Sequence, residues 1–223
     1  MIPLLLALLL PQADEADWVF RDAAIVDGSG GPGTVGDVAV KGDLILAVGR
    51  WTGTARRVVD ARGLVVAPGF IDLHSHSDRN ILDSRDNRNF TTQGCTAVVT
   101  GNCGGGRADV GAYLAEVDRE GAATNVLHLV PHGAVRAKIF GSADRPPTPE
   151  ELERMKAWVE RGLQEGAWGM STGLIYVPGT YAKTDEIVEL AKVVAARKAL
   201  YASHIRSEAE GLLEAVDEAI GIG

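Results

Sequence analysis

The spacing of hydrophobic and polar positions changes once along the chain. From about residue 17 to residue 66, short apolar runs alternate with glycine-rich turns. Two of these runs, at residues 36–41 and 44–48, are separated only by Gly42 and Asp43, which is typical of a tight hairpin. We therefore predict a small antiparallel β-sandwich module at residues 17–66.

From residue 67 onward, strand-like runs alternate with helix-like segments. The apolar runs predict strands at residues 66–73, 95–101, 125–130, 167–171 and 200–203. Helical spacing and capping residues predict a helix that ends near Gln93 and further helices at 109–119, 148–164, 184–198 and 207–220. This alternation is typical of a parallel sheet that is covered by helices.

Two architectures have this order of elements, an open doubly wound sheet and a (β/α)8 barrel. The first strand is not followed by a glycine-rich dinucleotide fingerprint, which disfavours the open sheet. We predict an α/β fold in which residues 67–223 form five βα units of an incomplete TIM barrel. A whole barrel takes about 250 residues, so the length indicates a truncated chain with an unpaired edge at the fifth strand. We expect it alone to be poorly soluble and inactive.

The composition restricts the class of protein. Hydrophobic residues make up 46% of the 223 positions and charged residues 23%, which excludes a wholly disordered chain. The formal net charge is −8 and no basic block occurs, so we predict no nucleic-acid partner. Cys95 and Cys103 flank one apolar run, and an extended run would hold them too far apart for a disulfide.

Residues 1–16 form a separate segment. Residues 1–10 are almost entirely apolar, and acidic residues follow them. The run is too short to cross a bilayer, so we predict no stable membrane span. It fits the hydrophobic part of a signal peptide, although a positively charged start is missing. We expect an exported protein, periplasmic or secreted; the alternative is a cytoplasmic protein with a disordered N-terminus.

Potential metal ligands follow three of the predicted strands. His74 and His76 end the first strand, and their spacing points both imidazoles to the same side. Cys103 follows the second strand, and His204 ends the fifth. The carboxyl ends of barrel strands meet at one rim, where active sites are built. We therefore expect these four side chains to meet, and their nitrogen and sulfur donors suit zinc.

Other polar residues near this rim are weaker candidates. His132 ends the third strand and could join the metal site or support it, whereas we expect His128 to be a hydrogen-bonded core residue. Asp72 could orient a ligand or pair locally. Asp78 is predicted to be a solvated loop residue, and Cys95 a buried, inert thiol.

Two residues are candidates for substrate binding. Tyr176 lies in the loop after the fourth strand and could donate a hydrogen bond to a substrate carboxylate. Arg206 follows His204 by two positions and could bind a carboxylate in a bidentate manner. An ion pair of Arg206 with Glu208 or Glu210 explains its presence equally well.

Four segments around these residues resemble a known family. Residues 68–76, which end in His74 and His76, resemble the first barrel strand of the amidohydrolase superfamily. Three further segments are similar to the N-acyl-D-amino-acid deacylases (D-aminoacylases), at residues 100–104, 171–176 and 201–208. The resemblance extends over about residues 17–223.

This resemblance implies a zinc-dependent hydrolase that splits a small N-acyl-D-amino acid into a carboxylate and a D-amino acid. It implies that one or two zinc ions bind at His74, His76, Cys103 and His204, and that Tyr176 and Arg206 hold the substrate carboxylate. The family also has a sixth-strand histidine ligand and an eighth-strand aspartate that acts as general base. Neither can be matched within these residues, so we assign no catalytic residue.

Two other interpretations stay open. A hydantoinase or dihydroorotase type of amidohydrolase resembles the same first strand but needs a carboxylated lysine at the end of the fourth strand. Residues 170–173 contain no lysine, which favours the deacylase. The other alternative is a non-catalytic fragment that binds metal.

Overall fold

The computed structural model describes residues 15–223. Their contacts divide them into two units, with the boundary between Pro68 and Gly69. The predicted signal peptide at residues 1–16 lies outside the described residues except for Glu15 and Ala16, which begin the first strand. None of the helices within residues 15–223 combines the length and apolar character needed to cross a bilayer.

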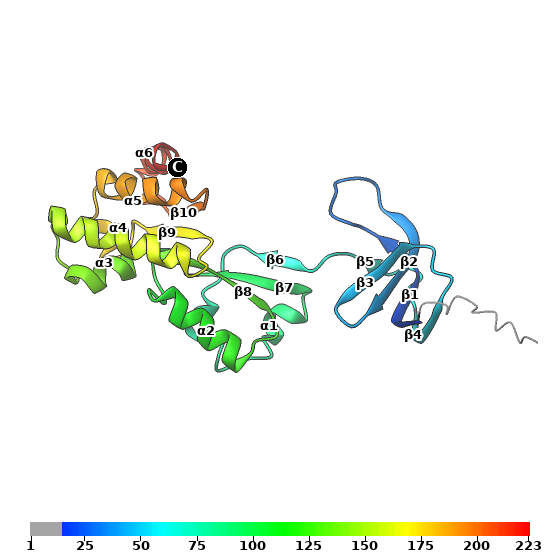
Figure 1. Ribbon diagram of the computed structural model, residues 1–223. Helices are drawn as coiled ribbons and strands as arrows, with labels where there is room; N and C mark the ends of the chain where they lie inside the picture. Colours follow the sequence, from blue (N-terminus) through cyan, green and yellow to red (C-terminus); the bar gives the residue numbers. More distant parts are fainter. Residues whose placement is uncertain (1–14) are drawn as a thin grey trace, which may run out of the picture. The chain divides into compact units, whose positions relative to one another are not determined.

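The first unit is a five-stranded sheet in the order β3-β2-β1-β4, with β5 also beside β1 (Figure 1). Its strands are β1 (Glu15–Ile25), β2 (Thr34–Lys41), β3 (Leu44–Gly49), β4 (Thr54–Asp60) and β5 (Val65–Val66). The predicted hairpin is the antiparallel pair of β2 and β3. However, β4 and β5 run parallel to β1, so the sheet is mixed rather than antiparallel as predicted. The apolar pattern shows where the strands are but not which way they run. After β3 the chain crosses to the other side of β1, and this connection makes β4 parallel to β1.

The second unit contains a curled parallel sheet in the order β10-β9-β8-β7-β6 (Figure 1). Its strands are β6 (Phe70–Asp72), β7 (Cys95–Thr100), β8 (Asn125–Pro131), β9 (Gly169–Gly173) and β10 (Leu200–His204). Neighbours in the sheet are also successive along the chain, and every pair is parallel. The predicted α/β fold, five strands of a partial barrel, is therefore confirmed.

Helices connect these strands. The α-helices are α1 (Arg88–Thr91), α2 (Val110–Glu120), α3 (His132–Phe140), α4 (Pro149–Gln164), α5 (Thr184–Ala196) and α6 (Leu212–Ile222), and two short 3-10 helices are η1 (Ser77–Arg79) and η2 (Gly179–Tyr181). The predicted capping box opens α4: the Thr148 hydroxyl accepts from the Glu151 amide at 3.2 Å, and the Glu151 carboxylate accepts from the Thr148 amide at 2.8 Å.

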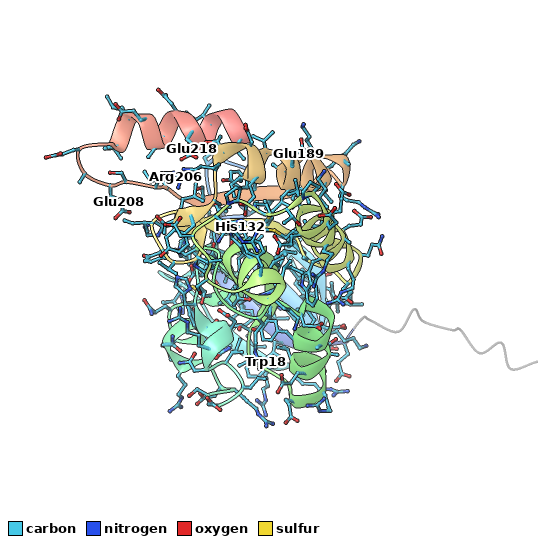
Figure 2. All side chains as sticks on the ribbon, turned by 90° about the vertical axis from the view of Figure 1, so that its left-hand side faces the viewer. Trp18, His132, Glu189, Arg206, Glu208 and Glu218 are labelled. Carbon is cyan, nitrogen blue, oxygen red and sulfur yellow. The ribbon has the colours of Figure 1, made fainter. Side chains whose placement is uncertain are left out.

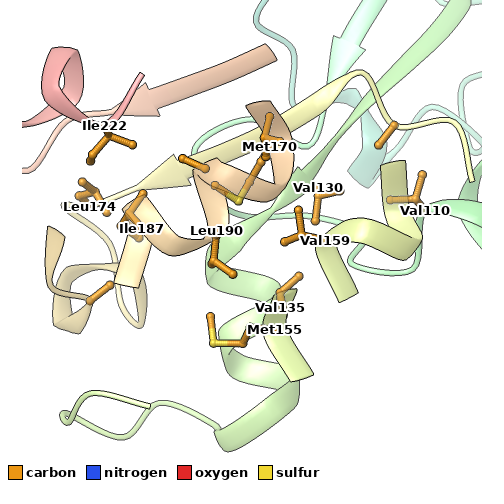
Figure 3. Close-up of a cluster of buried hydrophobic side chains, with 14 residues drawn as sticks. Val110, Val130, Val135, Met155, Val159, Met170, Leu174, Ile187, Leu190 and Ile222 are labelled. Carbon is orange, nitrogen blue, oxygen red and sulfur yellow. The ribbon is translucent and has the colours of Figure 1, made fainter. Parts of the chain in front are cut away.

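The main hydrophobic core lies between the sheet and helices α3, α4 and α5 (Figure 3). Val130 from β8 and Met170 from β9 meet Met155 from α4 and Leu190 from α5, and all four side chains are fully buried. Burial of each such side chain stabilises the fold by roughly 1.5–3 kcal/mol. This core packs against β8 and β9, which lie in the sheet between β7 and β10, the strands that precede Cys103 and end in His204.

The first predicted barrel strand, at 66–73, is split in two. Val66 belongs to β5 of the first unit, and β6 comprises only Phe70–Asp72. Pro68 lacks the amide hydrogen that a continuous strand would donate. In the described part of the chain β6 is an edge strand, which leaves Phe70 and Ile71 exposed rather than buried.

Three helical regions of the structure also differ from the prediction. The stretch before Gln93 consists mostly of turns, with only η1 and α1 as helical pieces. Helix α3 was not predicted, because its residues lack a clear apolar stripe. Helix α6 begins at Leu212 rather than at residue 207, because Ser207 forms a local turn in which its hydroxyl accepts from the Ala209 amide.

Candidate metal centre

The two histidines of the first barrel strand lie just beyond its end. The Asp72 carboxylate accepts a hydrogen bond from the His74 amide at 3.0 Å, so Asp72 pairs locally. Between the histidines, the Ser75 side chain is buried, and its amide donates to the Val99 carbonyl of β7. Side chains alternate along such an extended segment. His74 and His76 are therefore both exposed, with ring centroids 5.4 Å apart.

Cys103 lies in a tight loop after β7. Its own φ is +55°, and the following Gly104 has φ +66°, a left-handed conformation that glycine adopts at low cost. The Gly104 amide donates to the Ser171 hydroxyl of β9 at 3.0 Å, and its carbonyl accepts from the Ala134 amide of α3. These two contacts fix the half-buried Cys103 thiol at the end of its strand.

His204 ends β10, and its carbonyl accepts from the Leu174 amide, which continues the pairing with β9. The ring of Tyr176 lies edge-on to the His204 ring, with 4.8 Å between the centroids. Tyr176 itself is half exposed. Its ring therefore lies beside the carboxyl end of β10, and its predicted contact with a substrate carboxylate stays a prediction.

The structure brings the four predicted ligands together. Cys103 Sγ lies 3.3 Å from His74 Nε2 and 3.4 Å from His204 Nδ1. Ligand atoms of His74, His76 and Cys103 all lie within 4.8 Å of one another. His204 Nε2 is buried without a hydrogen-bond partner. His204 thus joins the cluster of His74, His76 and Cys103 through its contact with the Cys103 sulfur. Three imidazoles and one thiol are a donor set that fits zinc.

The surroundings shift the pKa values of two of these groups, His76 and Cys103. Although His76 is exposed, nearby protein atoms partly desolvate its ring; this desolvation, and after it the charge of His74, lowers the pKa of His76 and favours the neutral imidazole that binds metals. Burial raises the pKa of the Cys103 thiol, and the Arg79 guanidinium acts in the opposite direction. Metal binding would have to displace the proton of this thiol.

A cavity of about 620 Å³ opens beside these ligands. His76, Cys103 and Arg79 line one part of it, and Tyr176 and Pro178 line another. Small residues of helix α3 complete the wall, namely Gly133, Ala134 and Ala137. The cavity is large enough for a small organic molecule next to the metal ligands.

Arg206 is bound to other protein groups. Its guanidinium donates to both carboxylate oxygens of Glu218 on α6 at 2.9 Å and to the Thr180 and Ala182 carbonyls at 3.0 Å (Figure 2). The ion pair with Glu208 or Glu210 suggested by the sequence is not formed. The predicted contact with substrate stays a prediction, and the geometry favours a structural role.

The weaker candidates lie apart from the centre. His132 is fully buried, and its Nε2 lies 3.0 Å from the Glu186 carboxylate. His128 is buried with both ring nitrogens hydrogen bonded, as predicted. Asp78 is buried against Gly106, so its prediction as a solvated residue is wrong: the η1 turn directs it inward. Cys95 is a free, half-buried thiol.

The sequence reasoning missed two features of the site. Arg79 lines the cavity, and its only signal was its position three residues after His76. The fully buried Arg136 donates to Glu186 and to the Pro178 carbonyl, which ties helix α3 to the cavity wall. No pattern distinguishes Arg136 from a surface arginine, because its partners are far away along the chain.

Comparison with known proteins gives one consistent result. A family model described as the amidohydrolase family matches residues 57–218. The chain is 36% identical to the N-acyl-D-aspartate deacylase of Alcaligenes xylosoxydans xylosoxydans, over 94% of this chain and 47% of that protein. It thus spans about half the length of the curated relatives it matches.

Two solved structures are similar over nearly the whole chain. The N-acyl-D-glutamate deacylase from Bordetella bronchiseptica, complexed with zinc and a phosphonate inhibitor, superposes with a TM-score of 0.90 at 37% identity, over 94% of this chain and 49% of that one. A D-aminoacylase with a binuclear metal centre gives a TM-score of 0.88 at 34% identity, over 93% and 49% of the chains.

Proposed function

This chain belongs to the amidohydrolase family, and from that premise we propose that the full-length protein hydrolyses the amide bond of N-acyl-D-amino acids with the help of zinc. The observation that carries the proposal is the position of Cys103, with its sulfur within 3.4 Å of both His74 and His204. A thiol between histidines from two other strands supports a metal site rather than a chance cluster. The similar proteins named deacylases support the substrate class.

In this proposal His74, His76, Cys103 and His204 hold one or two zinc ions. When bound, zinc would supply Lewis-acid activation of the amide carbonyl and of the attacking water. The neutral form of His76, which partial desolvation favours, is the form that can serve as a ligand. Glu208, whose carboxylate lies 3.4 Å from His204 Nε2, could help to orient that ring.

The remaining groups would position the substrate. The Tyr176 hydroxyl could donate a hydrogen bond to the substrate carboxylate, because its half-exposed ring borders both the cavity and His204. The small side chains of Ala134 and Ala137 leave room in the cavity for an organic group. We expect the proton transfers to depend on the aspartate that the family resemblance places on a later strand.

The end of β9 favours this function over a hydantoinase or dihydroorotase. Its last residues, Ser171, Thr172 and Gly173, offer no lysine that could be carboxylated. Instead, Cys103 supplies a charged ligand from the neighbouring loop when its thiol is deprotonated.

The test compares Cys103→Ala with Cys95→Ala in the full-length protein. Cys95 lies at the opposite end of the same strand, so it is a matched control. We expect Cys103→Ala to lose tightly bound zinc and Cys95→Ala to keep the wild-type zinc content. We also expect chelator-sensitive hydrolysis of N-acetyl-D-leucine but not of its L-enantiomer. Unchanged zinc in Cys103→Ala, or hydrolysis that resists chelators, would refute the proposal.

A further inference from the structure

Arg79 is a cationic side chain on the wall of the cavity. It is the last residue of η1, which directly follows His76. It lines the cavity together with His76 and Cys103, so it borders the space beside the candidate metal ligands. Arg79 is also exposed, and a ligand in the cavity can therefore reach it.

Within the described residues the Arg79 side chain has no hydrogen-bond or ion-pair partner. Every other arginine of residues 69–223, with the exception of Arg154 on α4, forms an ion pair with a carboxylate. The neighbouring Asp78 does not form one, because it is buried against Gly106. A guanidinium that lines a cavity and has no carboxylate partner is free to bind an external anion.

The rest of the cavity wall fits an anionic ligand. In the described part of the chain no aspartate or glutamate lines the cavity, and its other polar side chains are those of His76, Asn102, Cys103 and Tyr176. Arg79 thus supplies the permanent charge of this wall. Guanidinium groups bind carboxylates with two parallel hydrogen bonds.

We propose that Arg79 is a substrate-binding residue whose guanidinium holds a carboxylate of the substrate in this cavity. The inference rests on the proposed function and deepens it. Arg206, the other arginine near these strand ends, already binds Glu218 and two carbonyl groups. This carboxylate belongs either to the amino-acid part of the substrate or to an anionic acyl group. The two parts lie on either side of the amide bond that is hydrolysed, so each can present a carboxylate to Arg79.

The test uses three variants of the full-length, zinc-loaded protein. Arg79→Met removes the charge, Arg79→Lys keeps it without the bidentate geometry, and Arg154→Met is the control, because Arg154 is also unpaired but does not line the cavity. Three substrates separate the sources of the carboxylate. N-acetyl-D-leucine carries it on the amino acid, N-succinyl-D-leucinamide on the acyl group, and N-acetyl-D-leucinamide carries none.

We expect Arg79→Met to lower kcat/KM roughly 10- to 100-fold for one of the two carboxylate substrates, mainly through KM, with partial recovery in Arg79→Lys. The substrate that is affected identifies the source. Hydrolysis of N-acetyl-D-leucinamide, and all rates of Arg154→Met, should stay within about twofold of wild type. An equal loss on all three substrates, or no loss, would overturn the assignment of Arg79.

Calorimetric binding separates this inference from the proposed function. If no compound is hydrolysed, the proposed function fails, but the binding of N-acetyl-D-leucine, N-succinyl-D-leucinamide and N-acetyl-D-leucinamide can still be measured. A Kd for either carboxylate compound that weakens at least tenfold in Arg79→Met, with no change in Arg154→Met, supports the role of Arg79. Equal Kd values in both variants overturn it.

Discussion

The buried charge cluster beside the cavity provides a quantitative test of the structure. Glu186 accepts one hydrogen bond from Arg136 at 3.2 Å and lies 3.0 Å from His132, and the side chains of these three residues are at most 3% exposed. Glu186→Gln removes the negative charge with little change in volume. The buried guanidinium then lacks its counter-ion, and loss of one partner from a buried ion pair typically costs about 3–5 kcal/mol.

The matched control is Glu160→Gln. Glu160 on α4 pairs with Arg197, but these side chains are 35% and 47% exposed. Solvent screens such a pair, so we expect a loss of only about 0–1 kcal/mol. The free energy of unfolding of both variants of the full-length protein would be measured in urea, with the slope m as a check that the transition is comparable.

A difference of less than about 1 kcal/mol in the free energy of unfolding between the two variants would refute the reasoning, because the Glu186 site would then be solvated rather than buried.

Glu186→Gln also tests the cavity wall. Arg136 donates to the Pro178 carbonyl, so a weakened Arg136 should loosen the loop that carries Tyr176. Faster hydrogen exchange in that loop is the expected signature.

Two further predictions concern the ligand loop and the acid response. Gly104→Ala should lower the zinc content, because Gly104 has a φ of +66° and an added Cβ would lie 2.7 Å from a backbone nitrogen of β9. Gly105→Ala should keep the wild-type zinc content, because a Cβ at that position would meet nothing within 4 Å. Equal zinc contents in the two variants would contradict the argument. The hydrogen bonds from Arg206 lower the pKa of Glu218. These hydrogen bonds therefore stabilise the folded protein at pH values above about 4.5, the pKa of Glu218 in the unfolded chain. The stabilisation is lost as the pH falls through the lower pKa of Glu218 in the folded protein. Glu218→Gln should therefore be less stable than wild type at pH 6, with a gap in unfolding temperature that narrows toward pH 3; a constant gap would contradict the assignment.

Much of the candidate site could be predicted because it depends on local pattern. Each of His74, Cys103 and His204 follows an apolar run, and parallel strands bring such positions to one edge. The order of strands in the barrel unit also follows from the sequence, since each βα unit places the next strand beside the last. The mixed sheet of the first unit could not be predicted in this way, because no helix constrains how its strands connect.

The ion-pair partners of the buried and half-buried arginines could not be predicted from the sequence. Arg206 pairs with Glu218 and not with its nearer neighbours Glu208 and Glu210, because α6 folds back over the strand end and brings Glu218 to it. Arg136 is buried because its partner Glu186 comes from another helix, 50 residues away along the chain. An ion pair between residues of two different elements follows no fixed spacing along the chain, so the sequence contains no signal for it.

The sequence by itself determined the alternation of strands and helices, the candidate metal ligands and the resemblance to a family. Those properties are encoded in residues close together along the chain, where periodicity and strand ends can be recognised. Only the tertiary structure decided which charges are neutralised and which remain available, and hence that Arg79 rather than Arg206 faces the cavity unpaired. That choice depends on which distant side chains meet when the helices pack against the sheet.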